Sequence, residues 1–210
     1  MPRLFDLFKN VSVLTLLLMG LSASPQSAEF KLYVHQPELP WYLSDSVTID
    51  LWKFYLCDMG CNSFRSGGCL LIDKDTVIKI QCELNRENDL FFRVGVDSMT
   101  QAHPDFTGDL SPLKNMYWTW HSGFIQLKAE GKILKSNGSW LPFQLHLGGF
   151  RRFPTDQLLH FIVNSDHAEL KWDEDRLAQV FQLNSSVNIM SECQDASRLM
   201  SKIVKCIQVE

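Results

Sequence analysis

The feature that most constrains the fold is a series of short segments rich in Val, Ile, Phe, Tyr and Trp, each bounded by turn-forming residues. Branched and aromatic side chains are typical of β-strands, and turn clusters such as residues 65–68 and 136–138 separate one strand from the next. We expect strands over residues 30–34, 47–57, 76–84, 90–96, 117–128, 143–147, 158–163 and 168–172. This pattern predicts an all-β fold, an antiparallel β-sandwich.

The C-terminal part of the chain predicts one or two short helices beside the strands. Asp173 stands where it can cap a helix over residues 174–182. Apolar residues at helical spacing in 199–204 predict a second helix that ends near Cys206. No repeat or low-complexity linker interrupts residues 29–210, so we expect a single domain, with 45% apolar residues to build its core.

Residues 1–28 have the layout of a secretory signal peptide. Arg3 and Lys9 precede an apolar run over residues 11–21, and small residues follow it up to Ala28. The run is too short to span a bilayer, and no cysteine follows it closely to carry a lipid. We therefore expect cleavage after Ala28 and export without a membrane anchor.

The charge and motif content of the chain exclude several classes of function. The formal net charge is −4 and there is no basic block, which argues against nucleic acid or an anionic membrane surface as the partner. The chain lacks GxSxG, HExxH and paired-carboxylate signatures. We therefore expect a binding protein rather than an enzyme.

The six cysteines fit an exported protein, because thiols outside the cytoplasm tend to be oxidised. Four lie close together in the sequence and two lie near the C-terminus: Cys57, Cys61, Cys69, Cys82, Cys193 and Cys206. Sequence alone does not give the connectivity, and the simplest scheme pairs the cluster internally and joins Cys193 to Cys206. The competing interpretation is a zinc site on the four clustered thiolates. Export favours the disulfides.

Strand periodicity places the aromatic and imidazole groups of the central region. Trp118 and Trp120 share one face of their strand, and His121 lies on the other. In residues 143–147 the apolar side chains point to one face, so His146 projects away from the apolar layer. Taken singly, two such tryptophans are usually packing residues and such a histidine is usually solvated.

A set of short motifs between residues 92 and 150 changes this interpretation. They are GVDS at 95–98, TGDLSPL at 107–113, MYWTW at 116–120, SGF at 122–124 and HLGGF at 146–150. Together they resemble the MbnP family, exported β-sandwich proteins of the metallo-mystery pair systems that also occur beside methanobactin operons. His121 departs from the family pattern, which usually has a glutamine there, and Phe124 stands where tyrosine is common.

The resemblance implies a periplasmic copper-binding protein whose partner is a di-haem, MauG-like enzyme, an MbnH-like homologue of the cytochrome c peroxidases. That partner oxidises a tryptophan towards kynurenine, and related proteins hold Cu(I) with a histidine and the kynurenine amine. On this chain the tryptophans correspond to Trp118 and Trp120. The resemblance therefore predicts copper, favoured as Cu(I), and we rank the candidate ligands in the order His146, His103, His121 and His35.

The chemistry that this resemblance implies is consistent with the residue types. Cu(I) is a soft ion that neutral imidazole binds well, whereas an intact indole offers only an N–H donor. Opening the indole ring exposes an aromatic amine, so oxidation by a partner converts a packing residue into a ligand. The protein then needs no catalytic residue of its own.

A second class of function stays open, a secreted β-sandwich recognition module without a metal. Such a module would stack a sugar or a partner protein on aromatic side chains, here Trp41, Trp118, Trp120 and Trp140. Chelation discriminates the two classes, because a metal-free module binds its partner equally well in the presence of a chelator.

Overall fold

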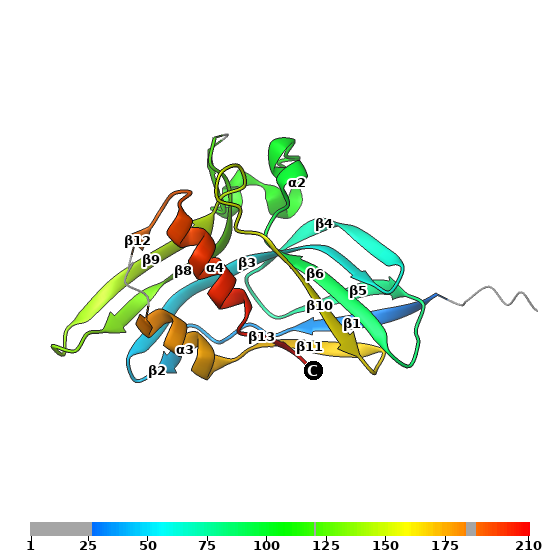
Figure 1. Cartoon of the computed structure of the whole chain (residues 1–210), viewed down its shortest axis with the longest axis horizontal. Coiled ribbons are helices and arrows are strands. Elements are labelled where there is room, and N and C mark those ends of the chain that lie inside the picture. The colour runs from blue at the N-terminus through cyan, green and yellow to red at the C-terminus, as the bar shows by residue number, and fades with distance from the viewer. Residues whose placement is uncertain (1–26, 120, 184–187) are drawn as a thin grey trace, which may run out of the picture.

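The structure, a computed structural model, describes residues 27–119, 121–183 and 188–210 (Figure 1). In chain order its elements are β1 (Ala28–Val34), β2 (Trp41–Ser44), β3 (Val47–Cys61), β4 (Phe64–Ile72), β5 (Thr76–Cys82), β6 (Asn88–Val94), α2 (Ser98–Ala102), the 3-10 helices η1 (Gly108–Leu110) and η2 (Pro112–Lys114), β7 (Tyr117–Thr119), β8 (Gly123–Leu134), β9 (Trp140–Gly148), β10 (Gln157–Val163), β11 (His167–Trp172), α3 (Glu174–Leu183), β12 (Asn188–Ile189), α4 (Gln194–Val204) and β13 (Ile207–Val209).

These strands form two sheets. In the described residues the smaller sheet has four strands in the order β13-β11-β1-β5. The larger sheet has nine strands and follows the path β10-β6-β3-β8-β9-β12, with β2 and β4 paired to β3 and β7 paired to β8. The long strand β3 is the centre of the larger sheet, and α3 and α4 lie along one side of the molecule (Figure 1).

The predicted all-β fold with one or two short C-terminal helices is confirmed, as two sheets that are mixed rather than purely antiparallel. Helices α3 and α4 occupy the predicted regions, and α3 begins directly after Asp173. Most strand pairs are antiparallel, but β1 pairs with β11 and β12 with β9 in parallel. The alternation of side chains in a sequence shows which face of a strand is buried, but not which strand will lie beside it or in which direction.

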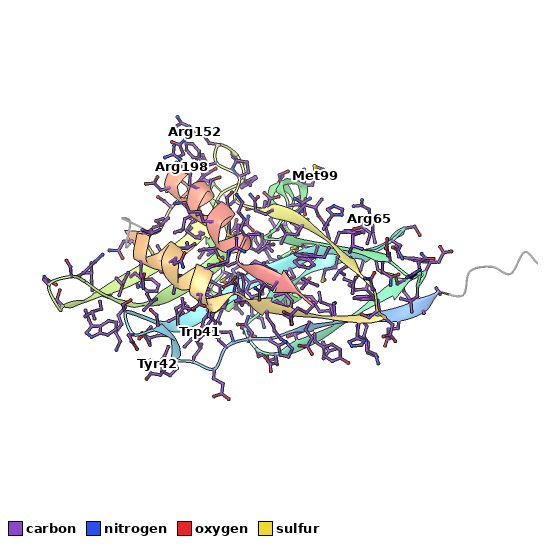
Figure 2. The ribbon with its side chains drawn as sticks, turned by 60° about the horizontal axis from the view of Figure 1, so that its bottom comes forward. Trp41, Tyr42, Arg65, Met99, Arg152 and Arg198 are labelled. Carbon is purple, nitrogen blue, oxygen red and sulfur yellow. A yellow bond between two sulfur atoms is a disulfide. The ribbon has the colours of Figure 1, made fainter. Side chains whose placement is uncertain are left out.

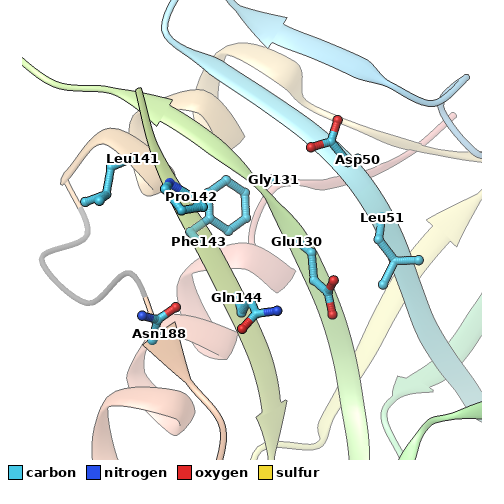
Figure 3. A pocket seen from close by; sticks show the side chains of 9 residues that line it. All are labelled: Asp50, Leu51, Glu130, Gly131, Leu141, Pro142, Phe143, Gln144 and Asn188. Atoms are coloured by element: carbon cyan, nitrogen blue, oxygen red, sulfur yellow. The ribbon is translucent and has the colours of Figure 1, made fainter. Parts of the chain in front are cut away.

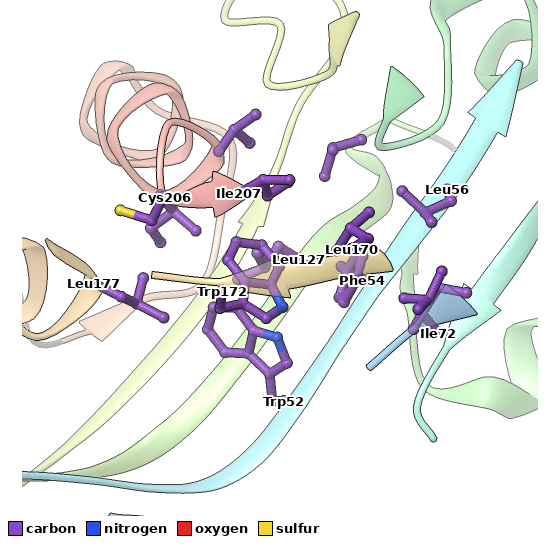
Figure 4. Close-up of a cluster of buried hydrophobic side chains, with 14 of the residues drawn as sticks. Trp52, Phe54, Leu56, Ile72, Leu127, Leu170, Trp172, Leu177, Cys206 and Ile207 are labelled. Carbon is purple, nitrogen blue, oxygen red and sulfur yellow. The ribbon is translucent and has the colours of Figure 1, made fainter. Parts of the chain in front are cut away.

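The main core lies between the two sheets and is built around tryptophan (Figure 4). Trp52 of β3 is 1% exposed, and its ring meets that of Trp172 on β11 edge to face with 5.0 Å between the centroids. Trp41 and Phe181 pack against the same indole at 5.8 and 6.4 Å. Alternate residues of β3 supply this face because successive side chains of a strand point to opposite sides of the sheet.

The opposite face of β3 carries a second, smaller hydrophobic cluster, which supports the connection between β6 and β7. Tyr55 points to this side and its ring packs edge to face with that of Phe124 at 5.9 Å. Its hydroxyl donates to the carbonyl of Asp109 at 3.0 Å, and burial, then the charge of Asp109, raises the pKa of Tyr55. The cluster therefore fixes the motif-rich connection on the outer face of the larger sheet.

Two disulfides join β3 to β4 of its own sheet and to β5 of the smaller sheet. Cys57 is bonded to Cys69 of β4, and Cys61 is bonded to Cys82 of β5. The predicted bridges within the cluster are confirmed, and these four sulfurs are not thiolates that hold zinc. Such bonds are typical of proteins outside the reducing cytoplasm.

The predicted bridge between Cys193 and Cys206 is wrong. Both are free cysteines, and they lie at opposite ends of α4, where Cys193 is the N-terminal cap. A helix rises about 1.5 Å per residue, so these two Cα atoms are roughly 15 Å or more apart. A disulfide needs Cα atoms within about 7 Å of each other.

A thiol count on denatured, unreduced protein should therefore find two reactive groups, those of Cys193 and Cys206. In the folded protein Cys193 should react faster, because it is only partly buried whereas Cys206 is buried. The Cys193→Ser variant should lose one reactive group. A count of zero would contradict the two free cysteines, and a higher count would contradict the disulfides.

No helix within the described ranges is long and apolar enough to cross a membrane. The predicted signal peptide lies almost entirely outside the described residues, which begin at residue 27. Ala28, the predicted cleavage point, is the first residue of β1 and pairs with Cys82 of β5.

Candidate functional site

The candidate site lies on the outer face of the larger sheet, where β8 and β9 run antiparallel. The register of this pair sets His146 opposite Lys128 and Gln144 opposite Glu130. Leu145, between Gln144 and His146, points into the main core. His146 therefore faces away from the core, as the alternation along the strand predicts.

The imidazole of His146 is buried on this outer face and is held by a carboxylate. Its side chain is 8% exposed, and Nε2 lies 2.7 Å from Oε1 of Glu130. Nζ of Lys128 lies 3.3 Å from the same oxygen. Among the described residues, Nδ1 has no hydrogen-bond partner. When Nε2 carries the proton and donates it to Glu130, Nδ1 keeps its lone pair.

Opposing effects act on the carboxyl group of Glu130. Burial raises its pKa, whereas the hydrogen bond with His146 and the positive charge of Lys128 lower it, and the net result is a pKa below 4.5. Glu130 is therefore a carboxylate at neutral pH, and this charged acceptor orients the imidazole of His146.

The Glu130→Gln variant should show over which pH range this carboxylate stabilises the fold. The pKa of Glu130 is lowered in the folded state, so its contribution is fully present above the unfolded pKa of about 4.5 and is lost as the pH falls through the folded pKa. The difference in unfolding free energy between wild type and variant should be constant at neutral pH and shrink in acid, as measured by urea titrations from pH 7 to 3. The control is Glu87→Gln at an exposed turn. A difference of the same size and pH dependence in the control would assign the effect to net charge.

Trp118 of β7 packs over the end of β9 on the same outer face. A Cβ atom added to Gly148 would lie 2.8 Å from Cζ3 of Trp118, so glycine leaves room for the indole. Gly148 and His146 are two residues apart on one strand, hence on one face and about 7 Å apart. The indole Nε1 is buried without a hydrogen-bond partner within the described part of the chain, as are those of Trp52 and Trp172 in the main core.

A buried glutamine, Gln101, attaches the short helix α2 to the hairpin of β7 and β8. Nε2 of Gln101 donates to the carbonyl of Val96 at 2.9 Å, and Oε1 accepts from the backbone N–H of Phe124 at 3.0 Å. His103 follows α2, and His121 lies in the turn between β7 and β8. Both are exposed, and the contact of Gln101 with Phe124 brings α2, which His103 follows, next to the start of β8, which His121 precedes.

The structure separates one predicted ligand from the others. His35 follows β1 in the smaller sheet, and its Nε2 lies 3.5 Å from a carboxylate oxygen of Glu169. Trp120 lies outside the described residues. In the three described ranges, no group of three or more His, Cys, Asp and Glu side chains is gathered as a ready metal site. The site thus consists of His146 and Trp118 on one face, while the exposed His103 and His121 lie on the two segments that Gln101 joins, α2 and the turn before β8.

Of the tryptophans expected to form a stacking platform, the three that the structure describes do not share a surface. Trp41 is buried in the main core, and its Nε1 donates to Glu174 at 3.1 Å. Trp140 begins β9, with Nζ of Lys132 over its ring at 5.4 Å, whereas Trp118 packs on the last residue of that strand. Eight strand residues span about 26 Å, so one ligand ring does not contact both.

An open pocket of about 740 Å³ lies beside Glu130 (Figure 3). Its polar lining includes Asp50 of β3, Gln144 of β9 and Asn188 of β12. Glu130 and Gln144 project side by side from neighbouring strands (Figure 3). The pocket brings solvent and solutes to the carboxylate that holds His146.

Sequence reasoning missed Glu130 and Gln101. Glu130 lies beyond the predicted strand 117–128, and nothing assigned it a partner across the sheet. The signal was the turn near Asn137 and Gly138, because extending an antiparallel hairpin from that turn pairs Lys128 with His146. Gln101 had no such signal, since its role depends on the tertiary placement of α2.

This two-sheet fold carries a histidine on β9 and a tryptophan on β7, both on the outer face of the larger sheet, and is thus a β-rich protein with its candidate site outside the core. A sequence model described as MbnP matches residues 27–195, and the chain belongs to the MbnP family. The solved structure of MbnP from Methylosinus trichosporium is similar, with a TM-score of 0.52 and 12% sequence identity over 80% of this chain and 83% of that chain. At this identity the likeness shows the fold. No curated protein matches the chain.

Proposed function

We propose that the protein is a periplasmic copper-binding protein that acquires, stores or hands over copper, and that a di-haem, MauG-like enzyme oxidises a tryptophan of its β7–β8 hairpin towards kynurenine. The observation that carries the proposal is the contact between His146 and Glu130. Histidines that bind metals commonly donate their second ring N–H to a carboxylate, which fixes the tautomer and directs the other nitrogen to the metal. His146 has such a carboxylate, beside Trp118 on the same face.

The residues present fit a soft cation of low coordination number. Nδ1 of His146 offers the lone pair of a neutral imidazole, a ligand that suits Cu(I). The intact indole of Trp118 has no lone pair to offer, but its Nε1 is buried and unpaired, so this nitrogen already lies in the packed site rather than in solvent. His103, which follows α2, and His121, in the turn between β7 and β8, are the candidates to complete the ligand set.

Oxidation would convert Trp118 from a packing residue into a ligand. The C2–C3 bond of the indole breaks, and two equivalents of peroxide, reduced to water at the partner's haem, supply both oxygen atoms of N-formylkynurenine. Hydrolysis then releases formate and leaves a free aromatic amine. Overall the residue gains one oxygen and loses one carbon. In this scheme the protein is the substrate of the reaction and has no catalytic residue.

Intact and peptide mass spectrometry with metal analysis, on protein purified from its native periplasm, tests the proposal. The expected result is bound copper together with oxidation confined to the peptide that carries Trp118 and Trp120. Each variant Trp118→Phe and Trp120→Phe should then show which ring is modified. Unmodified tryptophans and no copper after a copper challenge would reject the proposal.

A further inference from the structure

We propose that residues 150–153, which we call the arginine loop, form the docking surface for an acidic face of the haem enzyme that oxidises the neighbouring hairpin. The inference rests on the proposed function and adds to it the place and the charge of the contact. The loop follows β9 and reads Phe-Arg-Arg-Phe. Arg151 and Arg152 form the only adjacent pair of basic residues in the sequence.

The arginine loop lies directly beside the hairpin that carries the candidate tryptophans. A Cβ atom added to Gly123, the first residue of β8, would lie 2.9 Å from Cδ1 of Phe150. Trp118 packs in the same way on Gly148, two residues before Phe150. A partner that binds the arginine loop therefore lies next to the turn between β7 and β8.

Hydrogen bonds hold the backbone of the arginine loop in place, so both arginine side chains extend from an ordered segment. Oε1 of Glu192 accepts the backbone N–H groups of Arg152 and Phe153 at 2.8 and 2.9 Å. Oγ of Ser197, on α4, donates to the carbonyl of Pro154 at 2.8 Å. A pre-ordered loop loses little conformational entropy when a partner binds it.

The guanidinium groups of the loop have no carboxylate partner in the described part of the chain. They lie over aromatic rings, Arg151 over Phe150 at 5.3 Å and Arg152 over Phe153 at 5.2 Å. Arg198 on the same side of the molecule is different, because it pairs with Asp195 at 3.8 Å (Figure 2). The two loop arginines are therefore free to donate hydrogen bonds to carboxylates of another protein.

An acidic protein surface is the partner that this arrangement fits. The chain as a whole carries a net charge of −4, so two adjacent unpaired arginines are a local reversal of sign. Arginine and aromatic residues are enriched at protein interfaces, and a guanidinium binds carboxylates through paired hydrogen bonds.

The test is the rate of tryptophan oxidation by the di-haem enzyme from the same organism. In the Arg151→Glu/Arg152→Glu variant, kcat/KM at low ionic strength should fall about tenfold or more, since surface charges act mainly on association. Its dependence on salt should flatten, while the rate at saturating enzyme stays unchanged. The neutral variant Arg151→Gln/Arg152→Gln should show a smaller loss of kcat/KM. Because it adds no carboxylate near Glu192, it still tests the role of the positive charges if the charge-reversed variant displaces the loop.

The matched control is Arg65→Glu/Arg86→Glu, which changes the net charge by the same amount. Both residues are exposed and form no salt bridge within the described residues, and Arg65 lies far from Arg152 (Figure 2). Equal losses in the two charge-reversed variants would assign the effect to net charge, and no loss in either would reject the docking surface. Binding of wild type, but not of the loop variant, to phosphatidylglycerol vesicles would assign the loop to a membrane instead. Wild-type protein that the haem enzyme does not oxidise would reject the proposed function itself.

Discussion

Replacing Trp52 with alanine should lower the free energy of unfolding by about 3–5 kcal/mol, the range for large aromatic residues removed from a packed core. Trp52 is 1% exposed and its ring contacts Trp41, Trp172 and Phe181, which come from three other elements. The substitution leaves a cavity at the point where the two sheets and α3 meet. Most of the lost free energy of unfolding therefore comes from the packing contacts of the indole ring.

The indole N–H of Trp52 does not contribute to that loss, because it has no hydrogen-bond partner in the described part of the chain. Trp52→Phe keeps most of the packing and removes the unpaired donor, so it should cost much less than Trp52→Ala. Urea unfolding at neutral pH with the disulfides intact measures both variants.

Trp140→Ala is the control for the loss of one tryptophan. Trp140 is 45% exposed at the start of β9, so its removal should cost about 1 kcal/mol or less. A Trp52→Ala variant no less stable than Trp140→Ala would contradict the two-sheet core.

The strands and their buried faces follow from local pattern, and those parts of the fold are predictable. In β9 the alternation of residues 143–147 places Leu145 in the core and His146 on the other face, and both statements hold. The parallel pair of β1 and β11 is not predictable in this way. Lys31 lies opposite His167, and no local signal joins segments so distant in sequence.

The candidate site was predictable in part for the same reason. The histidine and the tryptophan were found from motif and face, but the burial of His146 was not, because it depends on Glu130 and Lys128 from the neighbouring strand. The wrong Cys193–Cys206 bridge has a related cause. Cysteine counting ignored the helix predicted between these residues, which holds them apart.

Replacing His146 with alanine should lower the affinity for Cu(I) about tenfold or more, as the loss of a metal-binding residue requires. The physical reason is the lone pair on Nδ1, which Glu130 leaves unprotonated by accepting the proton on Nε2. The fold should survive the change, because Lys128 still pairs with the carboxylate of Glu130 at 3.3 Å. Competition with a chromophoric Cu(I) chelator, on protein carrying its oxidised tryptophan, measures the affinity.

Two further variants separate the roles of the ring and of its carboxylate. Glu130→Gln keeps an acceptor for Nε2 but removes the charge, so it should weaken Cu(I) binding by less than His146→Ala does. His160→Ala removes a histidine that also contacts a carboxylate, Asp89 at 3.1 Å, but lies 54% exposed on β10. It should leave the affinity unchanged. If His146→Ala binds Cu(I) as tightly as His160→Ala, then His146 is not a ligand, and the contact with Glu130 serves only to satisfy a buried imidazole.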